Sequence, residues 1–326
     1  MADERGHMPE NGWHKGVLVA NAFLKTDKFV EHYVWLREAA KQYQIALSLL
    51  DNTGLLYPLG SSGHGVMAEK IGRLIEDNDF ILYWDKDIPL GMLLQHQCGM
   101  RGIPVFNSVE AVAACDNKFE TYRRLWLWNQ SCSRAEQIPL IPTIAAPMTY
   151  ENVGYQDMYF VEDVVRELGL PMVIKECYGS FGMQVYLAQT VQEVYSHTRR
   201  LAGKPFLYQK YIEKSSGRDV RIQVVGDKAV AAMYRFSENG DFRANITNGG
   251  SMRAYQPAPE ECALAVRAVK ALGLDFAGVD LLFGNGGQDC ADIVCEVNSN
   301  AHFKNMYDCT GVNAAECIMG YIRSAL

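Results

Sequence analysis

Short apolar runs alternate with amphipathic stretches through the first third of this chain, and this alternation restricts the fold more than any other feature. The apolar runs, typical of buried strands, are 16–20, 45–50, 80–84 and 105–106. The amphipathic stretches, typical of helices, are 27–42 and 90–100. Strands that alternate with helices form parallel sheets flanked by those helices. We therefore expect an N-terminal α/β domain, with Asp27 as the N-cap of its first helix.

The rest of the chain has an α+β pattern. Expected helices are 118–128, 161–168, 191–201 and 259–272, with one more at the C-terminus. Expected strands are 141–144, 172–176, 183–187, 206–209, 219–225, 228–236, 276–283 and 292–297. The tight turn at Gly226-Asp227 predicts a hairpin.

Composition excludes several classes of protein. The 326 residues carry a formal net charge of −7, and no run of Lys or Arg forms a basic stripe. We therefore expect neither a nucleic acid nor a membrane as partner. The polar N-terminus lacks the apolar segment of a signal peptide, which favours a cytoplasmic protein. Nine cysteines without a CxxC pair, among them Cys177, Cys290 and Cys295, are expected to be small buried hydrophobic residues.

A lysine at a strand end, Lys175, is followed by a glycine-rich loop from Tyr178 to Gly182. Glycines allow backbone N–H groups to approach phosphate oxygens, and the lysine adds positive charge. The segment is not a Walker loop. By itself such a strand–glycine turn–strand segment is more often a plain hairpin.

Oxygen ligands follow two apolar strands. Glu296 and Asn298 lie two residues apart, so a strand places them on one face, and Asp280 lies on the neighbouring strand. Three such donors suit Mg²⁺. A solvated strand face is the alternative for Glu-x-Asn by itself.

Basic residues near these segments offer phosphate contacts or ordinary surface salt bridges. Arg221 and Arg243 can bind phosphate with two hydrogen bonds each. Lys118 opens a helix, where its charge opposes the helix dipole unless an anion is bound.

Taken in order, these motifs resemble the RimK-like branch of the ATP-grasp superfamily. The residues that carry the resemblance are Asp116-Asn117-Lys118, Pro171 to Lys175 with its glycine loop, Gln209 to Ile212, Gly217 to Arg221, Gly240 to Asn245 with Gly249-Gly250, Ala277 to Asp280, and Glu296 to Asn298. Each motif is weak alone, but the ordered set is specific and covers the last two thirds of the chain. The segment 104–108 resembles the preceding domain of that family more loosely.

The resemblance implies an ATP-grasp fold behind an N-terminal α/β domain. Its implied divisions are a flexible arm at 1–12, the α/β domain at 13–115, a central ATP-grasp subdomain with a glycine-rich lid at 116–213, and a C-terminal subdomain with the magnesium site at 214–326. The residues implied to bind ATP are Lys118, Lys175, Gly179, Ser180, Phe181, Gly182, Gln209, Lys210, Tyr211, Ile212 and Asp219. Those implied to hold the transferred phosphate are Arg221, Arg243 and Asn245, and the implied Mg²⁺ ligands are Asp280, Glu296 and Asn298.

The sequence departs from the family pattern at three places. The glycine loop carries Tyr178 and Phe181, which are bulkier than expected there. Lys210 replaces the usual glutamate of the adenine hinge, so any carboxylate contact to adenine is lost. After Asn298 the chain reads Ser299-Asn300 rather than a Pro-Gly turn, which is similar to the branch that extends carrier-protein glutamates in lysine or arginine synthesis. Asn300, His302 and Lys304 are therefore candidate substrate residues.

The implied activity is ADP-forming ligation, in which ATP activates a carboxylate as an acyl-phosphate and an amine then attacks. The implied cofactors are ATP and one or two Mg²⁺ ions, with Mn²⁺ as a substitute. The implied partners are an amino-acid amine and a small-molecule, peptide or carrier-protein carboxylate, and the implied assembly is a homodimer or homotetramer. The alternatives are a phosphotransferase, a nucleotide-binding regulatory module without turnover, and an interaction domain unrelated to ATP.

Overall fold

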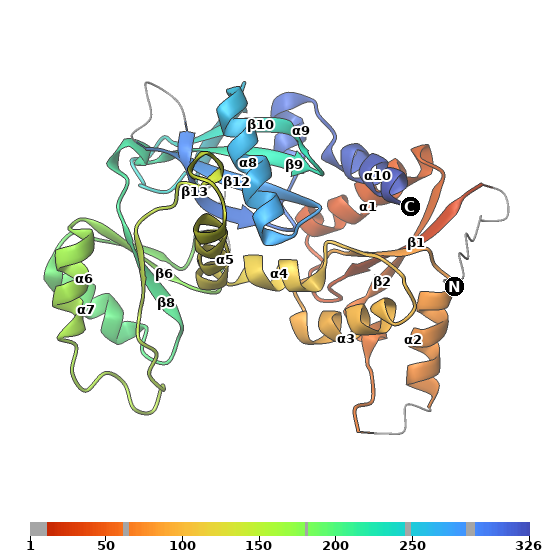
Figure 1. Ribbon diagram of the computed structural model, residues 1–326, viewed down its shortest axis with the longest axis horizontal. Coiled ribbons are helices and arrows are strands. Elements are labelled where there is room, and N and C mark those ends of the chain that lie inside the picture. Colours follow the sequence, from red (N-terminus) through yellow and green to blue (C-terminus); the bar gives the residue numbers. More distant parts are fainter. Residues whose placement is uncertain (1–11, 61–64, 180–181, 245–248, 285–290) are drawn as a thin grey trace.

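A computed structural model describes residues 12–60, 65–179, 182–244, 249–284 and 291–326. The predicted flexible arm, apart from Gly12, lies outside these residues. The described residues form three separate β-sheets. Figure 1 shows the N-terminal sheet and the central sheet towards opposite ends, with the C-terminal sheet between them.

The N-terminal sheet is parallel throughout, with strand order β2-β1-β3-β4. Its strands are β1 (His14–Ala20), β2 (Ile45–Asp51), β3 (Phe80–Tyr83) and β4 (Val105–Phe106). The accompanying helices are α1 (Asp27–Gln42), the 3₁₀ helix η1 (Asn52–Leu55), α2 (Val66–Glu76), α3 (Ile88–Gly99) and α4 (Val109–Asp116). The predicted parallel α/β sheet is confirmed.

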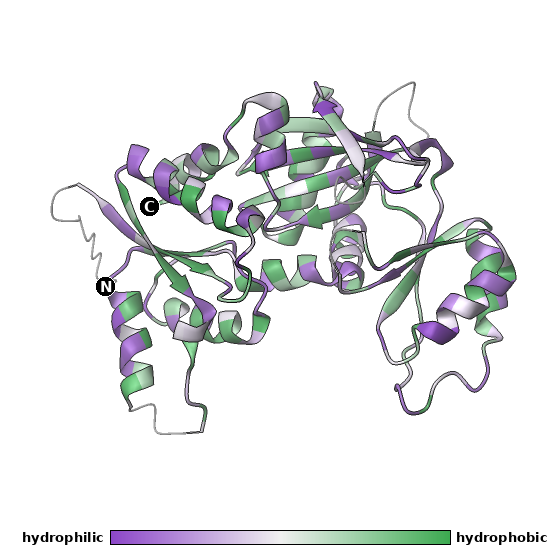
Figure 2. Cartoon of the chain, turned by 180° about the vertical axis from the view of Figure 1, so that it is seen from behind, coloured by the Kyte–Doolittle hydropathy of each residue, from purple (hydrophilic) through white to green (hydrophobic). Residues whose placement is uncertain are grey.

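Helices cover both faces of this sheet, because alternate residues of β1 point in opposite directions. Leu18 and Ala20 pack in a cluster with α1 and the last helix of the chain, α10 (Ala314–Ala325). Val17 and Val19 pack with α2, α3 and α4 on the other face. Figure 2 shows the resulting hydrophobic strands between helices that are hydrophilic on their outer sides.

The central sheet has the order β5-β8-β6-β7 and is antiparallel. Its elements are α5 (Lys118–Ser131), η2 (Arg134–Glu136), β5 (Thr143–Ala145), α6 (Phe160–Leu168), β6 (Met172–Glu176), β7 (Val185–Ala188), α7 (Val191–Arg200) and β8 (Phe206–Lys210). Helices α6 and α7 cover one face, where a separate apolar cluster forms.

The C-terminal sheet has the order β11-β10-β9-β12-β13 and is also antiparallel. Its elements are η3 (Glu213–Ser215), β9 (Arg218–Val225), β10 (Lys228–Ser237), β11 (Gly250–Ala254), α8 (Pro259–Leu272), β12 (Phe276–Phe283), β13 (Ala291–Asn298) and α9 (Lys304–Thr310), followed by α10. The predicted hairpin at Gly226-Asp227 is confirmed, since Lys228 pairs with Val225. Helix α8 packs on the largest apolar cluster of the described residues.

Two features join the N-terminal sheet to the C-terminal one. Helix α10 lies beside α1 in Figure 1 and shares its apolar cluster. The fully buried Asn107 accepts hydrogen bonds from the N–H groups of Asp275 and Phe276 and donates to the carbonyls of Phe276 and Ser299. These contacts hold the N-terminal sheet against β12 and against the segment after β13. Both β12 and that segment contribute lining residues to cavities. The predicted division assigns α1 to the domain at 13–115 and α10 to the subdomain at 214–326, although the two helices pack together.

Two local predictions are wrong. Thr26, not Asp27, is the N-cap of α1, and Asp27 is its first helical residue, where a negative charge faces the positive helix end. One helix is expected at the C-terminus, but the structure has two, because Gly311 ends α9 in a left-handed conformation and Asn313 caps α10. The bounds of α2, α4 and β11 were not predicted. None of the helices in the described ranges is long and apolar enough to cross a membrane.

Candidate functional site

A cavity of about 120 Å³, here called the smaller cavity, lies between the central and C-terminal sheets. It brings together most of the residues expected to bind a nucleotide. Those that line it are Lys118, Lys175, Gly179, Gly182, Gln209, Lys210, Tyr211, Ile212, Asp219, Arg243, Asp280 and Glu296. The predicted Ser180, Phe181 and Asn245 lie outside the described residues.

Lys118 reaches into this cavity from the first turn of α5. Asn117 caps that helix by accepting from the N–H groups of Phe119 and Glu120. The Lys118 ammonium donates to the Gly179 carbonyl at 2.9 Å and lies 3.6 Å from the Glu296 carboxylate. A cation at a helix N-terminus is unfavourable, so these two partners offset that cost.

The two ends of the glycine loop are held against the cavity. Gly179 has φ of +145°, and a Cβ there would lie 2.4 Å from the Gln184 side-chain oxygen, so the position requires glycine. At the other end Arg243 donates to the Gly182 carbonyl at 2.7 Å. Arg243 also binds Asp241 through two nitrogens, and these hydrogen bonds hold the pKa of Asp241 below its usual value. The loop ends therefore occupy the space in which an anionic ligand would meet Lys118 and Arg243.

Strand β6 contributes Lys175 to the smaller cavity, and the end of β8 with the two residues after it contributes the segment 209–212. The Lys175 ammonium lies 3.6 Å from the Cys295 sulfur. Gln209 is buried and donates to Thr143, whereas Lys210 has an exposed side chain and gives its backbone N–H to Pro142. All cysteines in the described ranges are free, and Cys290 lies outside them.

Four charged side chains form an alternating cluster, here called the charge cluster, on the floor of the site. Arg221 on β9 binds both oxygens of Asp280 on β12 at 2.6 and 2.7 Å. Arg235 on β10 binds both oxygens of Asp219 at 2.6 and 2.7 Å and lies 2.9 Å from Asp280. Strand register creates the cluster, since Asp219 faces Arg235 and Arg221 faces Asp280.

The charge cluster sets the protonation of its two acids. Burial alone would raise the pKa of Asp280, but the charges of Arg221 and Arg235 and their hydrogen bonds bring it below its usual value. Burial raises the pKa of Asp219, and repulsion from Asp280 adds to this against the attraction of Arg235. Asp280 is thus held as a carboxylate, with its oxygens facing two guanidinium groups.

The three predicted metal ligands lie on neighbouring strands. Asp280 is directly opposite Glu296, and Gly278 is directly opposite Asn298. The Asn298 side-chain nitrogen is buried without a hydrogen-bond partner. Within the described ranges, no group of three His, Cys, Asp or Glu residues could hold a metal ion. Glu296 and Asn298 therefore offer oxygen ligands, while Asp280 would first have to release an arginine.

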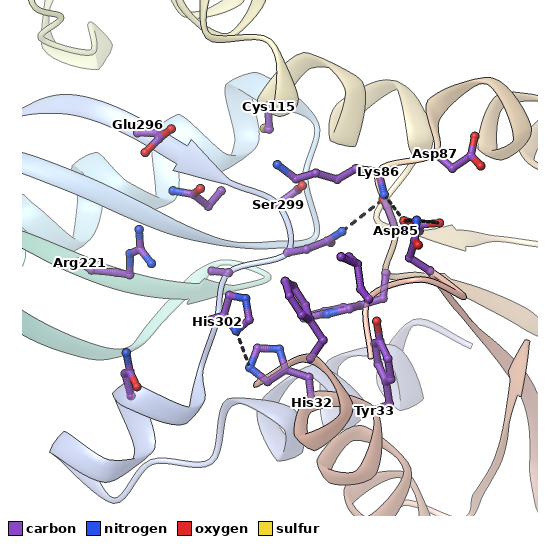
Figure 3. A pocket seen from close by; sticks show the side chains of 18 of the residues that line it. His32, Tyr33, Asp85, Lys86, Asp87, Cys115, Arg221, Glu296, Ser299 and His302 are labelled. Atoms are coloured by element: carbon purple, nitrogen blue, oxygen red, sulfur yellow. Dashed lines mark hydrogen bonds between the residues drawn. The ribbon is translucent and has the colours of Figure 1, made fainter. Parts of the chain in front are cut away.

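A second cavity of about 540 Å³, here called the larger cavity, is formed by the N-terminal and C-terminal parts of the chain. Arg235 and Glu296 line both cavities, so the two adjoin there. Figure 3 shows Glu296 and Arg221 on one side of the larger cavity and Asp85 on the other. Its polar and aromatic lining includes Asn21, Phe29, His32, Tyr33, Trp84, Asp85, Lys86, Asp87, Asn298, Ser299, Asn300, His302 and Asn305.

The segment after β13 forms one wall of the larger cavity. Asn300 donates to the Asp85 backbone carbonyl at 3.3 Å, and the His302 and His32 rings lie 3.2 Å apart at their nitrogens. Asn300 and His302, both predicted substrate residues, therefore line the cavity. Lys304 is not among the lining residues and pairs instead with Asp308 at the surface.

Sequence reasoning missed several of these residues, although a signal existed for some. Asn21 directly follows β1, and Asp85 lies two residues after the end of β3. Ligands of open parallel sheets bind at the carboxyl ends of strands, so polar residues at those positions were candidates. Arg235 gave no such signal, because only the register of β10 places it opposite Asp219.

Known proteins match this chain in sequence and in fold. A sequence model described as the RimK-like ATP-grasp domain matches residues 133–322. An "Uncharacterized protein MG012 homolog" of Mycoplasma pneumoniae is 33% identical over 222 residues, which cover 68% of this chain and 72% of that protein. A "Probable alpha-L-glutamate ligase" of Chromohalobacter salexigens is 41% identical over 156 residues, which cover 47% of this chain and 50% of that protein. The match to that ligase thus spans about half its length.

The fold has solved counterparts over nearly the whole chain. The ATP-grasp ligase PsnB, complexed with a minimal precursor, Mg and ADP, superposes with a TM-score of 0.64 at 18% identity. The superposition covers 95% of this chain and 98% of PsnB. Since the domain match alone spans more than half of the sequence, the chain belongs to the RimK-like ATP-grasp family.

Proposed function

We propose that this protein is an ATP-dependent ligase that joins a carboxylate to an amine and releases ADP and phosphate. The observation that supports this most directly is the pair of adjoining cavities that meet at Glu296 and Arg235. One cavity carries the lysines and glycines suited to a triphosphate. The other carries the mixed polar lining suited to a small organic substrate. A substrate carboxylate at the junction would face the terminal phosphate of ATP.

The nucleotide is proposed to occupy the smaller cavity. Lys118 and Lys175 neutralise phosphate oxygens, and the backbone of 210–212 contacts adenine, so Lys210 needs no carboxylate. Lys118 exchanges the Gly179 carbonyl for a phosphate oxygen, which opens space for the triphosphate. Asp219 contacts the ribose, and Arg221, Arg243 and Asn245 hold the transferred phosphate.

Glu296 and Asn298, with Asp280, are proposed to hold Mg²⁺, as one or two ions, with Mn²⁺ as a substitute. The donor set fits, because Mg²⁺ takes one or two carboxylates and completes its shell with water and phosphate oxygens. When bound, the ion neutralises charge on the phosphates.

The reaction is proposed to pass through an acyl-phosphate. The substrate carboxylate attacks the terminal phosphorus of ATP, and ADP leaves. The amine then attacks the acyl carbon, and phosphate leaves with the bonding electron pair. The nitrogen loses a proton, which the departing phosphate carries away, and an amide forms. No enzyme nucleophile takes part, and the glycine loop protects the acyl-phosphate from water.

The substrates are proposed to be an amino-acid amine and a carboxylate on a small molecule, a peptide or a carrier protein, bound by a homodimer or homotetramer in the cytoplasm. The relatives named alpha-L-glutamate ligase and the precursor bound to PsnB support an amino acid and a peptide. Asn300 and His302 contact the substrate in the larger cavity. Lys304 belongs to this set only if its Asp308 pair opens.

The test is an ATP-to-ADP assay with Mg²⁺ over a matrix of amino acids, short peptides and carboxylates, with mass spectrometry of the products. We expect a product joined by loss of water, and loss of that product in Glu296→Ala and after chelation of the metal. Glu76→Ala, a surface residue that pairs with Arg101, serves as the matched control. A phosphorylated acceptor instead of an amide would identify a phosphotransferase, and ATP binding without turnover across the matrix would contradict the ligase.

A further inference from the structure

The larger cavity contains a buried carboxylate that the proposed reaction does not use. Asp85 follows the end of β3 and is only 4% exposed. The Asn21 side-chain amide donates to its two oxygens at 3.1 and 3.4 Å, and the Lys86 backbone N–H donates at 2.7 Å. The Asn21 oxygen accepts from the Phe23 N–H, which fixes the amide with its nitrogen towards Asp85. Asp85 is thus held in one orientation by neutral donors.

Asp85 has no cationic side chain as a partner among the described residues. The neighbouring Lys86 sends its ammonium to Asp116 at 2.7 Å. Among the side chains that the structure describes, none forms an ion pair with Asp85. Burial accordingly raises the pKa of Asp85, since a carboxylate removed from water without a cation is unfavourable.

A second acceptor lies in the same wall. Asn300 donates through its side-chain nitrogen to the Asp85 backbone carbonyl, which can only accept. That bond fixes the Asn300 side-chain oxygen on the other side, where it is buried and has no hydrogen-bond partner. Asp85 and Asn300 both line the larger cavity, and they place a carboxylate and an amide oxygen, both acceptors, in the same wall.

We propose that Asp85 and Asn300 bind the primary ammonium group of an amino acid in the larger cavity, and that this ammonium is a recognition group distinct from the reacting carboxylate. An ammonium has three N–H donors and one positive charge. Its N–H groups can donate to the Asp85 carboxylate and to the Asn300 amide oxygen, and its charge neutralises the carboxylate. Glu296, at the junction with the smaller cavity, lies on the opposite side from Asp85 in Figure 3. The amino acid is thus oriented with its carboxylate towards ATP.

The nitrogen held at Asp85 stays protonated and has no lone pair, so it is not the amine that attacks the acyl-phosphate. That the carboxylate is the reacting group rests on the proposed function. The ammonium site itself is inferred from Asp85 and Asn300, independently of that function.

The test compares amino acids with the same molecules lacking the ammonium group: L-alanine with propionate, L-glutamate with glutarate, and L-phenylalanine with 3-phenylpropionate. Calorimetric binding is measured with Mg²⁺ and a non-hydrolysable ATP analogue, and ADP release is measured with ATP. In the wild type we expect the amino acid of at least one pair to bind about tenfold or more tightly than its partner.

Asp85→Asn keeps the shape of the side chain and removes its charge. We expect it to weaken binding of the amino acid about 10- to 100-fold, to leave binding of the deamino partner unchanged, and to raise KM far more than it changes kcat. The unliganded variant should be as thermally stable as the wild type or more so, because an unpaired buried charge is gone. Asp79→Asn, at the opposite end of the segment that forms β3, is the matched control and should leave both affinities unchanged.

The outcomes separate the two proposals. Equal affinity for both members of every pair, an equal loss of both in Asp85→Asn, or no binding of any amino acid would overturn the ammonium site. A large drop in the melting temperature of unliganded Asp85→Asn would also overturn it, in favour of a structural role. Selective amino-acid binding without ADP release would support the site and contradict the ligase, whereas ADP release without selectivity would do the reverse.

Discussion

Replacing Arg235 by methionine should destabilise the protein strongly, because Arg235 is the cation that both acids of the charge cluster share. Arg235 is 4% exposed at its side chain, and its partners Asp219 and Asp280 are 14% and 5% exposed. The intact cluster has two carboxylates and two guanidinium groups and is neutral. Without Arg235, two carboxylates share Arg221 alone. Breaking a buried pair in this way costs about 3–5 kcal/mol of unfolding free energy.

The pH dependence of that loss follows from Asp219. Its pKa already lies above the usual 3.8, mainly through burial, and loss of Arg235 raises it further. An acid with a raised folded-state pKa binds more protons when folded, so stability falls as pH rises from the unfolded pKa to the folded one. The destabilisation in Arg235→Met should therefore be smaller at about pH 5 than at about pH 8.

Urea unfolding followed by circular dichroism measures both effects, provided that the slope of the free energy against urea is unchanged. The double variant Arg235→Met, Asp219→Asn leaves one neutral pair, Arg221 with Asp280, and should recover about half of the lost free energy. A loss below about 1 kcal/mol would mean that the cluster behaves as a solvated surface network. Destabilisation that does not vary with pH, or a double variant less stable than the single one, would likewise refute the reasoning.

Two further predictions concern the wall of the larger cavity and helix α5. A Cβ at Gly278 would lie 2.6 Å from the Ala301 Cβ, so Gly278→Val should displace the segment after β13. We expect KM for the amino acid to rise about tenfold or more, with little change in KM for ATP. Equal effects on both constants would contradict this. Hydrogen bonds from Arg123 and Arg124 lower the pKa of Glu120 to about 2, so its contribution to stability is present above its usual 4.5 and is lost as pH falls towards 2. Because these three side chains are partly exposed, Glu120→Gln should cost no more than about 1 kcal/mol at neutral pH, and the gap in urea midpoints should shrink between about pH 5 and pH 3.

The sequence alone predicted most of the secondary structure and named the residues that are proposed to bind the nucleotide. Strong periodicity fixed elements such as β6 and α8 to their observed bounds, because each has one apolar face or run and ends at a glycine or proline signal. The lysines and the glycine loop were identified because they lie in short ordered motifs. Local chemistry is visible in a sequence when neighbouring residues carry it.

Local sequence was less informative where competing signals lay close together. Both Thr26 and Asp27 are possible N-caps, and backbone geometry, not residue preference, decides between them. Gly311 was not read as a helix end, although its left-handed conformation separates α9 from α10. The placement of α10 beside α1 depends on an apolar face that has no partner until both ends of the chain are folded.

The charge cluster and the larger cavity were decided by tertiary structure alone. Arg235 meets Asp280 only because β9 lies between β10 and β12, and residues 45 positions apart thereby share one hydrogen-bonding network. Asp85 meets Asn300 across 215 positions of sequence, because Asn107 and α10 hold the N-terminal sheet against the C-terminal one. Contacts at such separations follow from how sheets pack and register, and the periodicity of a single strand or helix carries no information about its distant neighbour.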